Sequence, residues 1–287
     1  MPSSKSITTA SRHSGKPGMA SAVQELRAQA ARNNAAEQRR ITSRLRQALA
    51  QDEFALLYEV QTDLRSGAPR GAEVLICLQH RRRGLVYPSH FMPVAEHSDI
   101  VIEIGNWAMQ QACWAAARLP PGFVLTIPVP HRQLMFGQLL KHVIQTFAEY
   151  NLDAGRIEFA LTETAMIDEN EDVNFALKAL RGVGAGLVLD NFGTSYTSLS
   201  LLKRLPLTTL KLDRSMIAGL PDSRENAAIL QATLQTAHAL GLEVIADGVE
   251  SESQARLIAD LGCDFAQGVH WHPPVGFEEL ASRLGKG

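Results

Sequence analysis

The chain has 287 residues, of which 45% are hydrophobic and 20% are charged, and its formal net charge is −2. This composition is typical of a globular protein, and the length fits one large α/β domain or two small ones. No stretch approaches the roughly 18 uninterrupted apolar residues of a spanning helix, so we predict no membrane span. Three scattered cysteines, Cys77, Cys113 and Cys263, argue against a disulfide framework and favour a cytoplasmic protein.

The near-neutral total hides a strong charge asymmetry. Residues 1–50 hold nine Lys and Arg against two acidic residues, a net charge of +7, so the remainder carries −9. Residues 1–20 are rich in Ser, Thr, Gly and Lys and lack an apolar stretch, which predicts a disordered basic tail without a secretory signal. Residues 21–40 are rich in Ala, Gln and Arg, which predicts a helical linker or arm.

From Phe54 onward, short apolar and β-branched runs alternate with longer helical patterns. The first two runs are separated by a polar loop with no room for a helix, so we predict that they pair antiparallel. The later strand–helix units predict parallel strands joined by right-handed crossovers. We therefore predict an α/β fold, a TIM-type (β/α)8-like barrel with an antiparallel first strand pair, preceded by an N-terminal helix. A doubly wound open sheet is the alternative. The predicted strands are 54–60, 71–78, 123–129, 157–162, 186–190, 208–212, 242–246 and 264–268, and the predicted helices are 101–118, 134–149, 172–181, 224–240 and 252–261.

Polar side chains recur where these predicted strands end. The active sites of barrels of this type lie at the C-terminal ends of the strands. Carboxylates and a lysine gathered there suit hard cations and a phosphate group. Helix capping explains any one such acid, but not the recurrence at successive strands. The residues are Glu73, Thr162, Glu163, Asp190, Asn191, Lys211, Asp213, Asp247, Glu250 and Gln267.

Several sequence blocks, in a fixed order, resemble the EAL-domain family of bacterial cyclic di-GMP phosphodiesterases. The longest block is LDNFGTSYTSLSLLKRLPLTTLKLDRS at 189–215. The others are AEVL (72–75), PSHFMPVAE (88–96), LTET (161–164), IADGVES (245–251) and GCDFAQG (262–268). The resemblance implies one barrel domain over residues 41–287 and a role in cyclic di-GMP signalling. In active members, two metal ions activate a water for in-line attack on one phosphodiester bond.

The resemblance also places the metal ligands, and several are missing from this chain. The asparagine ligand falls on Pro128 and a glutamate ligand falls on Ala160, and neither residue has a side-chain oxygen. One of the paired aspartates is Asn191, and a further glutamate is the shorter Asp247. We therefore predict no catalysis and no bound cofactor; residual activity would need Mg²⁺ or Mn²⁺ and be specific for cyclic di-GMP. The residual metal-ligand candidates are Glu73, Asp190 and Asn191, and the relics of the active cleft are Glu73, Asp190, Lys211, Asp247 and Gln267.

The nucleotide pocket implied by the resemblance is altered as well. An arginine that helps to hold the ligand corresponds to Cys77, which deletes bidentate contacts. Glu59 replaces a glutamine and adds a negative charge near the place of a dianionic ligand. These changes predict weakened binding of cyclic di-GMP. The predicted remainder of the ligand-binding set is Leu75, Phe91, Pro93, Glu250 and Gln267.

The loop after Asp190 connects the metal site to dimerisation in active relatives. Glu163 corresponds to the residue that braces this loop, and Ser195 replaces a glycine within it. Retention of the loop is consistent with a homodimer, and completion of the barrel rim is an equal alternative.

The basic features are the N-terminal arm and the run Arg81-Arg82-Arg83. The arm has no aromatic residue between Met1 and Asp52, so we predict no nucleic-acid binding. We predict a catalytically inactive, cytoplasmic regulatory protein of cyclic di-GMP signalling that acts by binding a protein partner. The alternatives are a non-catalytic cyclic di-GMP receptor and, less favoured, a metal-dependent phosphodiesterase.

Overall fold

A computed structural model of the chain describes residues 19–80, 82, 84–136, 138–162, 171–194 and 199–285, with the side chains of 19–34, 199 and 200 left out. Four residues named above, Arg81, Arg83, Glu163 and Ser195, and the predicted tail as far as residue 18 therefore lie outside the described residues. Within the described part of the chain, no helix is both long and apolar enough to cross a membrane.

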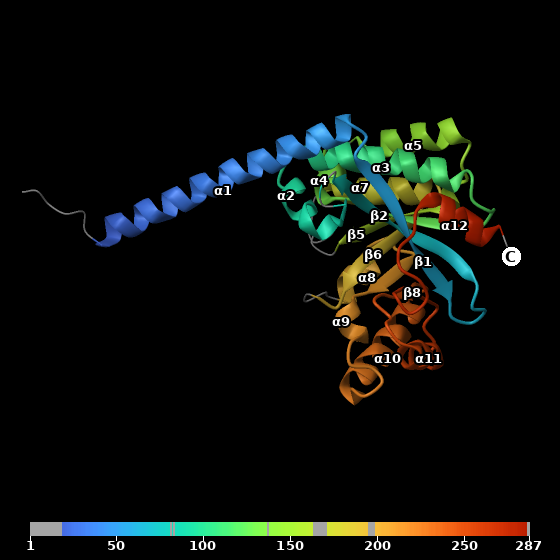
Figure 1. The fold of residues 1–287 in the computed structure, drawn as a ribbon. Helices are drawn as coiled ribbons and strands as arrows, with labels where there is room; N and C mark the ends of the chain where they lie inside the picture. Colours follow the sequence, from blue (N-terminus) through green and yellow to red (C-terminus); the bar gives the residue numbers. More distant parts are fainter. Residues whose placement is uncertain are drawn as a thin grey trace, which may run out of the picture.

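The described strands form one sheet that closes into an eight-stranded barrel (Figure 1). Its order is β1-β9-β8-β7-β6-β5-β4-β2, and β1 pairs with β2 to close the circle, while β3 extends β2 outside the barrel. β1 runs antiparallel to both of its neighbours, and the other barrel strands run parallel to one another. This confirms the predicted barrel with its antiparallel first pair and excludes the open sheet. The strands are β1 (Phe54–Asp63), β2 (Pro69–His80), β3 (Gly84–Val86), β4 (Val124–Pro128), β5 (Ile157–Thr162), β6 (Gly186–Phe192), β7 (Thr209–Leu212), β8 (Glu243–Ala246) and β9 (Phe265–Ala266).

Helices cover the outside of the barrel, mostly between consecutive strands (Figure 1). The predicted helix at 134–149 is in fact two helices, α4 and α5, and the helix α12 near the C-terminus was not predicted. The helices are α1 (Met19–Ala50), α2 (Met92–Ala95), α3 (Ile100–Ala116), α4 (His131–Met135), α5 (Leu139–Tyr150), α7 (Glu171–Gly182), α8 (Leu199–Arg204), α9 (Arg214–Ile217), α10 (Arg224–Ala239), α11 (Glu252–Asp260) and α12 (Phe277–Leu284), with short 3-10 turns η1 (Pro88–His90) and η2 (Ala154–Arg156).

Helix α1 is a single 32-residue helix, about 48 Å long at the α-helical rise. Its C-terminal end lies against the barrel, while its N-terminal half extends away from the body (Figure 1). Leu45 and Ala48 are buried there in a hydrophobic cluster that includes Phe54, Phe91 and Ile104. The helix therefore continues without interruption across residues 40 and 41, and its last turns are part of the packed domain.

The barrel strands alternate between an apolar outer face and a polar inner face. On β2, Ala72 and Val74 are buried in the main hydrophobic core, whereas Glu73 between them faces the barrel interior. β5 repeats the pattern, because Ile157 and Phe159 belong to the core and the intervening Glu158 is a buried charge. The alternation gathers buried polar side chains inside the barrel, where the candidate site lies.

Candidate functional site

Lys211 on β7 lies at the centre of a buried ion cluster near the C-terminal ends of the parallel strands. Its Nζ lies 2.5 Å from Glu73 Oε2, 3.2 Å from Asp190 Oδ1 and 3.9 Å from Asp247 Oδ2. Only 3% of the lysine is exposed. The structure thus brings together four of the five predicted relics from three strands and the loop after β8.

Gln267, the fifth predicted relic, follows β9 and is hydrogen-bonded to this cluster. Its Nε2 donates to Glu73 Oε2 at 2.5 Å and to Asp247 Oδ1 at 3.0 Å. Its Oε1 accepts a hydrogen bond from Gln61 Nε2 at 3.2 Å. We call Glu73, Asp190, Lys211, Asp247 and Gln267 the barrel-mouth cluster. Its donors and acceptors satisfy one another, as buried polar groups require.

The barrel-mouth cluster contains three carboxylates and only one ammonium group. Burial opposes the charge of Lys211, but Glu73, Asp190 and Asp247 outweigh it and raise the pKa of the ammonium well above its usual value. Glu59 lies directly opposite Glu73 in the β1–β2 register. Burial, with Asp247 and Glu73 adding to it, raises the pKa of Glu59 to about 7. One ammonium therefore faces more negative charge than it neutralises.

The two positions without a ligand, Pro128 and Ala160, are direct partners in the parallel register of β4 and β5. Val129 N–H also donates to the Ala160 carbonyl at 2.8 Å, which holds the two strand ends together. Since β4 and β5 stand side by side between β2 and β6, these residues make one continuous gap in the ring of side-chain oxygens.

The donor set does not fit a two-metal centre. Two cations a few ångströms apart need oxygen ligands from several sides. Here the ring is open across two adjacent strands, and the Lys211 ammonium lies between the Glu73 and Asp190 carboxylates. In the part of the chain that the structure describes, no three His, Cys, Asp or Glu side chains are grouped to hold a metal ion.

Asn191 sits in a strained backbone position next to the cluster. Its φ of 57° is left-handed, and the β6–β7 register shifts between Leu189 and Phe192, which places Asn191 in an irregularity of the strand. Asparagine is one of the few residues other than glycine that adopt this conformation readily. Its carbonyl accepts a hydrogen bond from Thr194 Oγ1 at 2.9 Å, which fixes the start of the following loop.

Leu75 and Cys77 lie on the same face of β2 as Glu73, because side chains alternate along a strand. Leu75 is half-buried, whereas the Cys77 thiol is fully buried, and burial raises its pKa to about 11. The cysteine in place of the family's arginine therefore offers neither a charge nor an exposed donor on this face.

The other predicted ligand-binding residues lie away from the barrel-mouth cluster or at the surface. Phe91 belongs to the hydrophobic cluster under α1, with its ring centroid 5.8 Å from that of Phe54. Pro93 and Glu250 are exposed. Of the predicted ligand-binding set, Leu75 shares the face of β2 that carries Glu73, and Gln267 is part of the barrel-mouth cluster.

A second buried polar group, which the sequence did not predict, lies deeper in the barrel. Arg70 forms a bidentate pair with Glu158, with N–O distances of 2.5 and 3.0 Å, and its guanidinium lies over the Phe265 ring. Thr126 Oγ1 also donates to Glu158 at 3.0 Å. Arg70 Nη1 donates to Gln61 Oε1 at 3.2 Å, so hydrogen bonds run without a break from Glu158 through Gln61 and Gln267 to the barrel-mouth cluster.

The sequence does carry one signal of this deeper group. Gly186 is the register partner of Glu158, and a Cβ there would lie 2.5 Å from Glu158 Cγ. The glycine at the start of β6 thus leaves room for the buried carboxylate. The charged residue inside the apolar run IEFALT (157–162) is a second sequence signal of a buried carboxylate.

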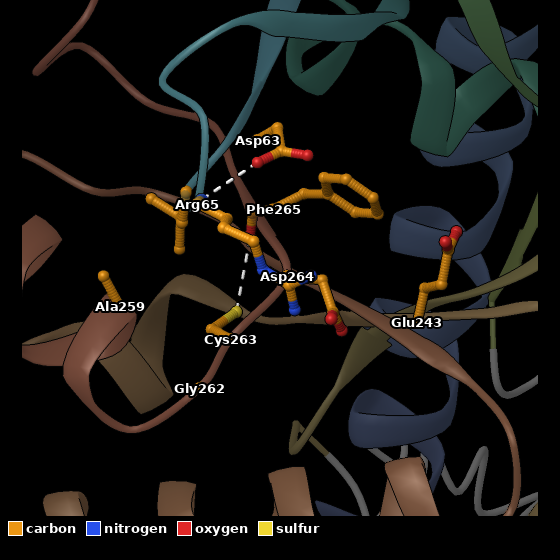
Figure 2. Close-up of a pocket in the computed structure, with 9 residues that line it drawn as sticks. Asp63, Arg65, Glu243, Ala259, Gly262, Cys263, Asp264 and Phe265 are labelled. Carbon is orange, nitrogen blue, oxygen red and sulfur yellow. Dashed lines mark hydrogen bonds between the residues drawn. The ribbon is translucent and has the colours of Figure 1, made fainter.

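A cavity of about 430 Å³ opens where β8 and β9 begin, at the end of the barrel away from the cluster (Figure 2). Its acidic groups already have partners. Asp63 accepts from Arg65 N–H at 2.9 Å, and Asp264 accepts from Val244 N–H and lies 2.9 Å from His238 Nε2. Active sites of this fold lie at the opposite end of the strands, so we assign this cavity no chemistry.

Comparison with known proteins identifies the family. Residues 42–274 match the model of the EAL domain. The chain belongs to the EAL domain family. It is therefore an EAL domain of cyclic di-GMP signalling, as the sequence blocks predicted.

Relatives and solved structures agree with this assignment. An uncharacterised protein of Synechocystis is 37% identical over 248 residues, which cover 85% of this chain and 36% of that protein. The bifunctional diguanylate cyclase/cyclic di-GMP phosphodiesterase MucR of Pseudomonas aeruginosa is 31% identical over 88% of this chain and 37% of its own length. The MucR phosphodiesterase structure in complex with cyclic di-GMP superimposes with a TM-score of 0.79, at 30% identity, over 84% of this chain and 99% of that one. The chain thus spans little more than a third of these two full-length relatives.

Proposed function

We propose that this protein is a cytoplasmic regulatory EAL protein that lacks phosphodiesterase activity and acts by binding another protein. The observation that carries this proposal is the register pairing of Pro128 with Ala160. Loss of two ligands at neighbouring strand ends removes oxygens from the same side of the site, so the remaining carboxylates have no means to surround a pair of cations.

The chemistry of the remaining residues supports the same proposal. Lys211, which the resemblance places in the active cleft as well, is in contact with Glu73 and close to Asp190, and its ammonium supplies no ligand in place of the two that are missing. Catalysis of this type needs a metal to lower the pKa of a bound water, and fewer ligands weaken metal binding and water activation together.

We expect no linear dinucleotide from cyclic di-GMP when the full chain is incubated with excess Mg²⁺ or Mn²⁺. The measurement is chromatographic separation of substrate and product over several hours, with the MucR phosphodiesterase domain as the positive control. Clear turnover that Glu73→Ala abolishes would overturn the proposal. Turnover that survives Glu73→Ala would instead identify a contaminating enzyme.

The competing function is a non-catalytic cyclic di-GMP receptor, and Cys77 and Glu59 argue against it. The buried thiol supplies no phosphate contact, and Glu59 adds a carboxylate beside Glu73. We expect calorimetry to show binding weaker than micromolar or none, and we expect Glu59→Gln to bind more tightly than the native chain because it removes a repulsive charge. A tight, stoichiometric isotherm for the native chain would establish the receptor function.

A further inference from the structure

A groove of about 580 Å³ lies between the C-terminal half of α1 and the segment from β2 to η1. This volume is in the range of ligand-binding pockets. One wall is apolar and contains Leu78, Leu85, Tyr87 and Phe91. Leu85 and Tyr87 are 37% and 42% exposed. We call this feature the α1–β3 groove.

The polar groups that line the α1–β3 groove are mainly basic. They are Arg40, Arg44, His80 and His90, against the single acid Glu37, which accepts two hydrogen bonds from Arg40 at 2.6 and 2.9 Å. Arg44 pairs with the largely buried Glu53 through Nη2, and its buried Nη1 has no hydrogen-bond partner. The turn that joins β2 to β3 adds the exposed Arg82, in a domain whose net charge is otherwise strongly negative. The residues that line the groove therefore carry a formal surplus of one positive charge, because two arginines stand against one glutamate.

The groove also contains a free strand edge. β3 is the last strand of the sheet and pairs only with β2. Gln79 N–H donates to Glu53 on the β1 side, and Gln79 is the register partner of Leu85. In an antiparallel pair, the backbone N–H and C=O of Leu85 therefore point away from β2. Exposed edges of this kind pair with added strands.

We propose that the α1–β3 groove binds an extended acidic segment of a protein partner, which adds as a strand to the free edge of β3. Alternate apolar side chains of the segment contact Leu85 and Tyr87, and its acidic side chains face Arg40 and Arg44. This inference rests on the proposed function as a protein-binding regulator and names the chemistry of the partner. It also gives Arg40 and Arg44, two basic residues of α1, a role in recognition of the partner.

The probe is a fluorescein-labelled ten-residue peptide that alternates Asp or Glu with Leu or Ile, titrated with the full chain and followed by fluorescence anisotropy. Two matched peptides carry Lys in place of the acids or Ser in place of the apolar residues. We expect micromolar binding of the acidic apolar peptide alone, weakened as salt rises from low to physiological concentration. Hydrogen exchange at the Leu85 amide is expected to slow when the peptide binds.

The matched variants are Arg40→Glu and Arg39→Glu. Arg40 lines the α1–β3 groove, whereas the adjacent Arg39 lies on the opposite flank of the same helix. Both are exposed and both variants change the net charge equally. We expect Arg40→Glu to weaken the peptide about tenfold or more and Arg39→Glu to change it less than about twofold. Leu85→Pro removes the outward N–H together with the Leu85 side chain, and it is expected to abolish binding without lowering the melting temperature, because the Leu85 N–H does not face β2.

Equal losses in Arg39→Glu and Arg40→Glu would overturn the proposal in favour of non-specific attraction. Binding that depends on Arg40 to phosphatidylserine vesicles or to a single-stranded oligonucleotide, without peptide binding, would identify a different partner class. Self-association in sedimentation experiments that Arg40→Glu abolishes would identify a second copy as the occupant. Cyclic di-GMP turnover is measured in a separate assay. If the peptide does not bind, the inference about the groove is wrong, whereas the proposed absence of catalysis is unaffected.

Discussion

Replacement of Lys211 by methionine is expected to lower the free energy of unfolding by about 3–5 kcal/mol, because it leaves the buried Glu73 and the half-buried Asp190 and Asp247 without their counter-ion. For a domain of this size the melting temperature falls by roughly 2–4 °C per kcal/mol, so the expected decrease is about 6–20 °C. Thermal unfolding followed by circular dichroism at neutral pH measures this directly.

The matched control is Lys141→Met on α5, which removes the same charge from an exposed position and is expected to change stability by less than about 0.5 kcal/mol. Glu73→Gln in the Lys211→Met background removes one of the unpaired charges and is expected to recover part of the loss. If Lys211→Met and Lys141→Met unfold at the same temperature, Lys211 is not the counter-ion of this cluster.

Local sequence pattern was sufficient to predict most of the fold. The loop between β1 and β2 is too short for a crossover helix, so their antiparallel pairing followed from length alone. β3 was missed because three residues after an arginine-rich turn are too few to show any periodicity. The split between α4 and α5 was missed because the hydrophobic spacing continues across the break, where the described residues Phe136 and Gln138 lie outside both helices.

The barrel-mouth cluster was predictable because parallel strands of a barrel end on the same side, which forces their terminal polar residues together. What the sequence did not reveal is register. The contact between Pro128 and Ala160 depends on how β4 and β5 are aligned, and the pairing of Arg70 with Glu158 joins residues 88 positions apart. Gln61 and Thr126 were missed for the same reason, since each lies in the middle of a strand rather than at its end.

The deeper pair gives the second large effect. Arg70→Met is expected to destabilise the protein by about 3–5 kcal/mol, because Glu158, whose side chain is 6% exposed, keeps its charge and loses its bidentate partner. The control is Arg65→Met, an exposed arginine near the same end of the barrel, which is expected to have little effect. Urea unfolding measures both.

The double variant Arg70→Met/Glu158→Leu separates a true ion pair from two independent packing residues. If burial of an unpaired carboxylate causes the loss, removing both charges restores most of the stability, since apolar replacement of a buried ion pair is often close to neutral. If instead the two single losses add, the residues act independently. Restored stability would also show that the interior hydrogen bonds from Glu158 to Gln61 are not needed to hold the barrel. The polar interior would then be retained in a chain that has proline and alanine at two predicted ligand positions, Pro128 and Ala160.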